Sequence, residues 1–365
     1  MKISSYILIA LLPVLLAACS AADAPEGSGS KATADGLISY TVSAAQTRTA
    51  ISGTTFPTDN TFCVYAYEGT EATPFIDGEV VSCLNGTVWA TKDNYYWPDG
   101  TVNFFAIYPT TLSFNTATKT LSYTVPTDIS LQDDVLYETV TTAKDDAIVT
   151  GNTTKANAVP LTFHHALSQI AFKGKISSDN QGWTVDVSKI EICNVNGSGT
   201  LDLTQATKTW TNLSAPADYE VGLRSGIGTL AYYESGTTTV AEAQNLTADD
   251  GVLLLMPQVL TAWDNTAVNV TTATNTGCYL AVTCYIRSAS EDIRGTTTTH
   301  QTVYVPFDNG TTGWLAGKKY TYTLNFGAGL DADGNGITTD DTTAITITTT
   351  VTDWTDGGSE SVIVD

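Results

Sequence analysis

Apolar and polar residues alternate along most of this chain, with the two-residue period of a β-strand that buries one face. The alternation is clearest at residues 38–42, 62–66, 102–106, 183–187 and 320–326. Turn-forming sequences such as Pro98-Asp99-Gly100 recur between these stretches. No stretch of comparable length has the period of an amphipathic helix. The pattern predicts an all-β protein, most readily built from β-sandwiches.

The length of the chain, 365 residues, suits two domains of ordinary size. A polar, turn-rich stretch at residues 143–159 separates two groups of alternating segments. We therefore expect an N-terminal β-sandwich domain over residues 37–158 and a C-terminal one over residues 159–365.

The first residues have the pattern of a secretory signal peptide. Lys2 supplies a positive start, residues 7–18 form a short apolar run, and the run ends in Leu16-Ala17-Ala18-Cys19. A cysteine at this point resembles the bacterial lipobox, in which the sulfur receives diacylglycerol before cleavage. We expect a signal peptide over residues 1–18, a lipid on Cys19 and a flexible tether over 19–36. An ordinary signal peptide with an incidental cysteine is the alternative.

The chain is strongly acidic, with 38 Asp and Glu against 16 Lys and Arg and a net charge of −22. Such a surface repels phosphate backbones, so nucleic acid is not an expected partner. The acidic residues are dispersed, as on a solvated surface.

Five cysteines remain if Cys19 carries lipid, and an odd number cannot all pair within one chain. Cys63 and Cys83 can form a disulfide if their strands are neighbours. Cys278 and Cys284 would lie about 20 Å apart on one straight strand, beyond disulfide reach. Burial as small hydrophobic residues is an equally good interpretation for all five, including Cys193.

Residues that suggest chemistry are few. His164 and His165 are adjacent, so on a strand they point to opposite faces and cannot chelate one metal unaided. Asp331, Asp333 and Asn335 copy the first half of a calcium loop, but Thr342 stands where the bidentate Glu belongs. An acidic hairpin turn is the simpler interpretation. No Gly-x-Ser-x-Gly elbow is present, and we expect no enzymatic activity and no cofactor beyond the lipid.

Several segments in order along the chain carry a family resemblance. They are Thr47-Arg48-Thr49-Ala50, Phe62-Cys63-Val64-Tyr65-Ala66-Tyr67, Tyr95-Tyr96-Trp97-Pro98-Asp99-Gly100, residues 103–109, 134–137, 161–170 and 314–322, and Val351-Thr352-Asp353-Trp354. Together they resemble the fimbrillin family, the pilus subunits and related surface lipoproteins of Bacteroidales.

The resemblance implies two transthyretin-like sandwiches and a subunit that reaches the outer membrane as a lipoprotein. It also implies that a trypsin-like protease cuts after Arg48, which would leave Thr49 as the first residue. The strand lost would be residues 36–43, with Ile38, Tyr40 and Val42 facing inward. A strand from another fimbrial subunit would fill the groove. Near the other end, residues 344–352 and 361–364 can supply or complete the donor strand, with Ile345, Ile347 and Val351 as its apolar positions.

The resemblance thus favours a fimbrial subunit, stalk or tip, that supports adhesion to host or bacterial surface ligands. A second hypothesis is a monomeric, lipid-anchored glycan-binding protein that is never cut at Arg48. Its sugar platforms would be Trp89, Trp210 or Trp263, provided that these side chains are exposed.

Overall fold

The structure of the protein is a computed structural model. It describes residues 36–44, 56–84, 86, 88–144, 146, 158–177, 182–225, 230–231, 243–249, 251–264, 270, 275–327, 345–353 and 362–363. The described chain is all-β and includes a short 3-10 helix, η2, at Ile129–Leu131. The predicted fold class is therefore confirmed at the level of secondary structure. Among the described residues, no helix has the length and apolar character needed to span a membrane.

The N-terminal part is a sheet of seven strands that closes on itself in the order β1-β4-β3-β2-β5-β8-β9. The strands are β1 (Ser39–Ala44), β2 (Phe62–Glu68), β3 (Ile76–Leu84), β4 (Val88–Thr91), β5 (Thr101–Tyr108), β8 (Leu136–Ala143) and β9 (Ala158–His165). Inward-facing residues from all of these strands form one hydrophobic core, in which aromatic rings dominate. We refer to it as the first core. Its rings meet mostly edge to face, as for Phe56 with Trp89 and Tyr40 with Phe104.

The C-terminal part contains two further sheets. One has the order β14-β10-β19-β20-β21 with β15 beside β10, and the other runs β17-β16-β11-β7-β6 with β12, β13 and β18 alongside. The strands are β6 (Ser113–Asn115), β7 (Thr120–Thr124), β10 (Ser168–Ile176), β11 (Thr184–Asp202), β12 (Trp210–Glu220), β13 (Leu230–Ala231), β14 (Gln244–Asn245), β15 (Leu253–Leu255), β16 (Tyr279–Arg287), β17 (Asp292–Arg294), β18 (Gln301–Pro306), β19 (Lys318–Phe326), β20 (Ile345–Asp353) and β21 (Val362–Ile363). Apolar residues from both sheets belong to a second, larger core.

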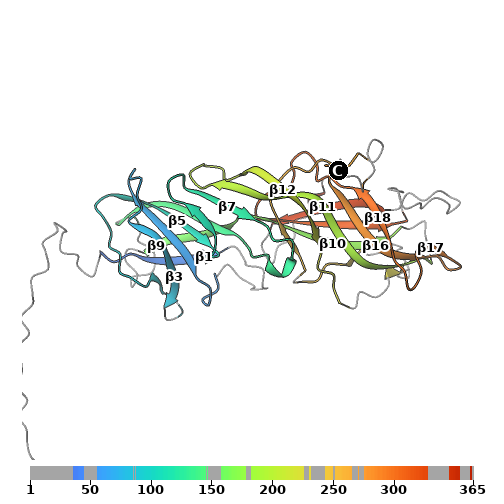
Figure 1. Ribbon diagram of the computed structural model, residues 1–365. Helices are drawn as coiled ribbons and strands as arrows, with labels where there is room; N and C mark the ends of the chain where they lie inside the picture. The colour runs from blue at the N-terminus through green and yellow to red at the C-terminus, as the bar shows by residue number, and fades with distance from the viewer. Residues whose placement is uncertain are drawn as a thin grey trace, which may run out of the picture.

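The two parts lie end to end in an elongated molecule, and the chain crosses between them more than once (Figure 1). The β6–β7 hairpin comes between β5 and β8 in sequence, yet β7 pairs with β11 of the second part. Its Phe114 packs against Tyr65 of β2, with ring centroids 4.4 Å apart. The hairpin therefore joins the outer face of the closed sheet to the second core.

The expected division at residues 158 and 159 falls at the start of β9. This strand pairs with β1 and β8 of the closed sheet, and the chain enters the second part after His165. The exact limits of independent domains stay a prediction, because β6 and β7 also belong to the second part by pairing.

Candidate functional site

The first strand of the closed sheet, β1, lies between β4 and β9. On one side it runs parallel to β9, with register from Ser39 opposite Ala158 to Ala44 opposite Phe163. On the other side the antiparallel register with β4 is limited to Tyr40 opposite Trp89. Just before the strand, the Ile38 backbone N–H donates to the Tyr95 carbonyl at 2.8 Å. Strand β1 thus closes the sheet, but it is secured along its length on one side only.

Alternate side chains of β1 and the residue before it point into the first core. Ile38 is 2% exposed and Tyr40 is 1% exposed, while Val42 is partly buried against the same cluster. The tyrosine ring meets Phe62 and Phe104 edge to face, at centroid distances of 6.4 and 6.2 Å. The inward orientation expected for these three residues is confirmed. Without β1, the core would lose these side chains and two strand edges would lose their neighbour.

Tyr40 places a polar hydroxyl group inside the first core. Its hydroxyl oxygen is buried and has no hydrogen-bond partner among the described residues. Burial also raises the pKa of its phenol well above the usual range. An unpaired buried hydroxyl costs free energy, about 1–3 kcal/mol for groups of this kind. The strand that closes the sheet therefore carries a local destabilising feature at its centre.

Residues 45–55 link β1 to the rest of the closed sheet and contain Arg48 and Thr49. These two residues lie outside the described part of the chain, as do Cys19 and the calcium-loop candidates Asp331, Asp333 and Asn335. Lipidation, cleavage and calcium binding therefore stay predictions. A cut at Arg48 would leave β1 attached to its sheet by non-covalent contacts alone.

Strand β20 contains the candidate donor residues Ile345, Ile347 and Val351. It pairs antiparallel with β19 along its whole length, from Phe326 opposite Ile345 to Lys318 opposite Asp353. On its other side, the described pairing is with β21 at Thr350 and Val351. Ile345 is buried in the second core, whereas Ile347 and Val351 pack against it while partly exposed. The segment forms an apolar, alternating strand near the edge of its own sheet.

A buried, hydrogen-bonded pair of titratable side chains lies where the chain crosses between the two cores, and the sequence patterns do not reveal it. His165 Nδ1 lies 2.7 Å from Asp134 Oδ2, and both side chains are almost fully buried. Val135 belongs to the second core and Leu136 to the first. Burial raises the pKa of the Asp134 carboxyl, and the neighbouring His165 partly opposes that effect. The buried contact links the two ends of the crossing segment, so His165 has a structural role in this fold.

His164 points the other way, is largely exposed and faces Glu138 at 3.8 Å. The opposite orientation of the two histidines is as expected. No group of three or more His, Cys, Asp or Glu side chains able to hold a metal occurs among the described residues.

The three tryptophans considered as sugar platforms are buried. Trp89 belongs to the first core, Trp210 to the second, and Trp263 is equally inaccessible. Trp210 also donates its indole N–H to the Ala166 carbonyl at 2.6 Å. The platform hypothesis is therefore wrong for these residues, because a stacking sugar needs an open ring face.

The five described cysteines are all free thiols. Cys63 and Cys83 lie on the adjacent strands β2 and β3, but Cys63 is opposite Val80 and Cys83 is opposite Trp89. The possible disulfide between them is thus not formed. Four of the five thiols are buried, which confirms their interpretation as small hydrophobic residues.

Comparison with known proteins places the chain in a family. A sequence model of the fimbrillin-like family matches residues 47–354, so the chain belongs to this family. No curated protein matched the chain.

Solved structures show the same fold at low sequence identity. A fimbrial protein from Bacteroides vulgatus is 17% identical with a TM-score of 0.54, over 87% of this chain and 99% of that one. A candidate cell adhesion protein from Parabacteroides distasonis is 12% identical with a TM-score of 0.50, over 89% and 99% of the two chains. The likeness thus extends over nearly the whole of both relatives.

Proposed function

We propose that this protein is a fimbrial subunit that polymerises by exchange of its first strand. The observation that carries the proposal is the place of β1. It fills a slot between β4 and β9, buries Ile38 and Tyr40, and is followed by the linking segment that contains Arg48. Loss of such a strand leaves an apolar groove with two unpaired edges, which a strand from a neighbouring molecule can fill.

The complete route begins at the membrane. Cys19 receives diacylglycerol, the signal peptide is removed, and the chain reaches the outer surface on its lipid anchor. A trypsin-like protease then cuts after Arg48, and β1 leaves with the anchor. The segment around Ile345, Ile347 and Val351 then acts as the donor that enters the slot of the next subunit.

The alternation of β20 supports this role, because Ile345, Ile347 and Val351 lie on one face, as Ile38, Tyr40 and Val42 do in β1. We further propose that the two parts are both transthyretin-like sandwiches. Each begins with a strand that pairs in parallel with a late strand, β1 with β9 and β10 with β19. The assembled fibre supports adhesion to surface ligands, with this chain as stalk or tip.

Cleavage and assembly are tested with the purified chain and an arginine-specific protease. We expect a new N-terminus at Thr49 and a ladder of oligomers on gels of unheated samples. Arg48→Gln should abolish both, whereas Arg287→Gln, at an exposed position in β16, should change neither. A ladder that persists in Arg48→Gln, or a cut chain that stays monomeric, would overturn strand exchange.

The donor is tested separately. A synthetic peptide of residues 345–353 added to the cut chain should occupy the slot and shorten the ladder, and a scrambled peptide should not. If the two peptides have equal effects, β20 is not the donor strand. That result would not contradict the proposal that loss of β1 opens a slot.

A further inference from the structure

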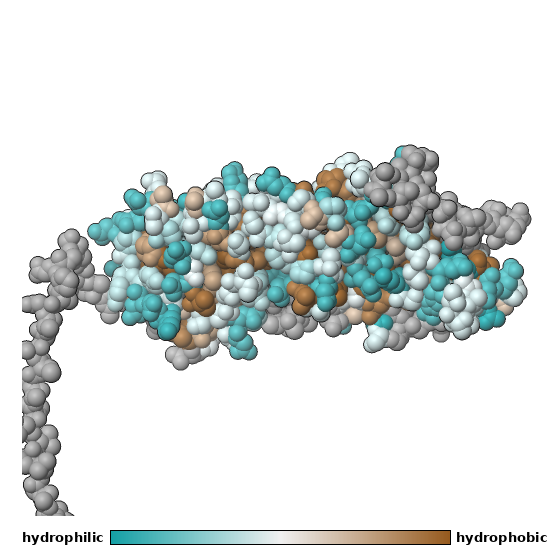
Figure 2. Space-filling model, in the orientation of Figure 1, coloured by the Kyte–Doolittle hydropathy of each residue, from teal (hydrophilic) through white to brown (hydrophobic). Residues whose placement is uncertain are grey.

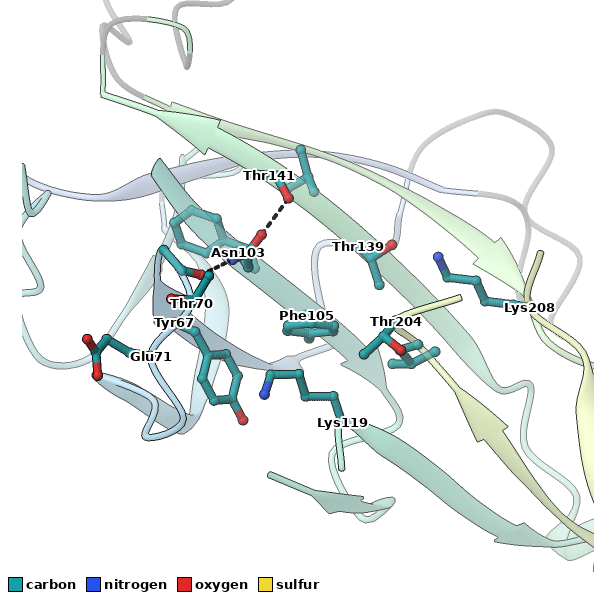
Figure 3. A pocket seen from close by; sticks show the side chains of 14 residues that line it. Tyr67, Thr70, Glu71, Asn103, Phe105, Lys119, Thr139, Thr141, Thr204 and Lys208 are labelled. Carbon is teal, nitrogen blue, oxygen red and sulfur yellow. Dashed lines mark hydrogen bonds between the residues drawn. The ribbon is translucent and has the colours of Figure 1, made fainter. Parts of the chain in front are cut away.

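A pocket of about 360 Å³ lies where the closed sheet meets the second part of the molecule (Figure 3). One wall is the outer face of the closed sheet, with Tyr67 of β2, Phe105 of β5 and Thr139 of β8. The other wall comes from Lys119, just before β7, and from Thr204 and Lys208, which come after β11. The volume is within the range of small-molecule sites, about 300–1,000 Å³. No residue of β1 or β20 lines it.

The pocket places two lysines on a strongly acidic protein. Lys119, Lys208 and Glu71 are its charged lining residues, and the net charge of the chain is −22. Lys208 also acts electrostatically on the carboxyl groups of Glu138 and Asp202. Neither lysine forms an ion pair with any carboxylate of the described residues. In Figure 3, Lys119 extends toward Tyr67 and Lys208 toward Thr139, with Thr204 between them.

The positions of these groups are fixed by the fold. The Lys119 ammonium lies 4.4 Å from the centroid of the Tyr67 ring, a cation–π contact. The Asn103 amide donates to the Gly69 carbonyl at 2.6 Å and accepts from the Thr141 hydroxyl at 2.6 Å. The buried rings of Tyr67 and Phe105 form an apolar floor. The pocket thus combines a lysine held against an aromatic ring, a second lysine and several threonine hydroxyls above an apolar floor.

We propose that this pocket binds a sugar acid, a ring that carries a carboxylate and several hydroxyls, such as a terminal uronic acid. The carboxylate would accept a charge-assisted hydrogen bond from one of the two lysines, which is stronger than a neutral one, and the other lysine would donate to a ring hydroxyl. The ring hydroxyls would pair with the threonine rim. The site is independent of assembly, because it is complete in one uncut chain.

The test uses the uncut full chain and titrates it with D-glucuronic acid and D-galacturonic acid by ligand-observed NMR and calorimetry. Saturable binding is expected for at least one acid, together with weakening at higher ionic strength. Glucose and galactose, which lack the carboxylate, should bind at least about tenfold more weakly, as the loss of charge-assisted bonds implies. Acetate and phosphate serve as controls for simple anion binding.

Variants of the two lysines test whether the ligand binds in this pocket. Lys208→Ala and Lys119→Ala should each weaken binding about tenfold, and Lys208→Gln should do the same with less change of shape. Lys92→Ala, at an exposed position outside the pocket, should leave binding unchanged. Thermal melts confirm that each variant folds. The proposal is overturned by the absence of saturable binding, by equal binding of neutral sugars or simple anions, or by folded lysine variants that bind as the parent does.

Discussion

Strands β1 and β20 are paired in similar ways but differ in side-chain burial. Each is paired along its whole length on one side, β1 with β9 and β20 with β19, and only locally on the other side, with β4 and β21. Tyr40 of β1 and Ile38, the residue before the strand, lie fully inside the first core. Strand β20 buries Ile345 fully, but Ile347 and Val351 only in part.

This difference indicates which of the two strands leaves the larger gap when it is lost. Removal of β1 opens a central slot lined by aromatic rings, so the sheet has a strong need for a replacement. Removal of β20 would leave β19 and β21 each without a neighbour, with a smaller loss of apolar burial. The face seen in Figure 2 shows hydrophobic residues in separate small patches among hydrophilic ones. The slot, in contrast, is lined by the contiguous side chains of the first core, whose burial can drive the entry of a new strand.

The largest expected effect is at Tyr40. Tyr40→Ala should lower the free energy of unfolding by about 4 kcal/mol, because a buried aromatic side chain is lost from the first core. Tyr40→Phe should be neutral or stabilising, because the hydroxyl it removes is buried without a partner among the described residues. Urea denaturation measures both. A clear loss of stability in Tyr40→Phe would contradict the destabilising role of the hydroxyl.

The second largest effect is expected at the buried Asp134–His165 pair between the two cores. Asp134→Ala should lower the free energy of unfolding by about 3 kcal/mol, because it leaves His165 buried beside a cavity and without this partner. Because burial raises the pKa of Asp134 in the folded state, its contribution to stability is present below about pH 4 and is lost as pH rises through the folded value. Asp134→Asn should therefore gain stability relative to the parent between acidic and neutral pH. A relative loss over that interval would show that the pKa is lowered.

Strand β20 should be less sensitive than β1. We expect Ile345→Ala to lower the free energy of unfolding by about 2 kcal/mol, because Ile345 is fully buried. Val351→Ala should lower it by about 1 kcal/mol, because Val351 is only partly buried. Thr348→Ala, at an exposed position in the same strand, is the matched control and should change little. Losses at Ile345 as large as at Tyr40 would remove the contrast between the two strands.

The smallest effect concerns thiol reactivity in the native state. Burial raises the pKa of Cys193, Cys278 and Cys284, the last to about 12, so their reactive thiolates are scarce at neutral pH. Cys83, which is only partly buried, should be labelled first by iodoacetamide. Mass spectrometry of timed samples gives the order. Early labelling of Cys284 would show that the second core opens more readily than its packing implies.

Much of the fold was accessible from local pattern. The alternating stretches at 38–42, 62–66 and 320–326 correspond to β1, β2 and β19, and the inward side chains of β1 are those expected. The sugar platforms failed because exposure of a tryptophan depends on what packs over it. The Asp134–His165 pair was missed because its members are 31 residues apart, and the segments that contain them do not indicate that these two side chains meet.

Local sequence was enough to specify where strands form and which of their faces are apolar, because both depend on the alternation of neighbouring residues. Long-range packing alone established that β1 runs parallel to β9, that the β6–β7 hairpin joins the second part, and that Lys119 and Lys208 line one pocket. Those outcomes depend on strand pairing between distant segments. A period of two residues specifies a face of a strand, but it does not specify the partner of that strand.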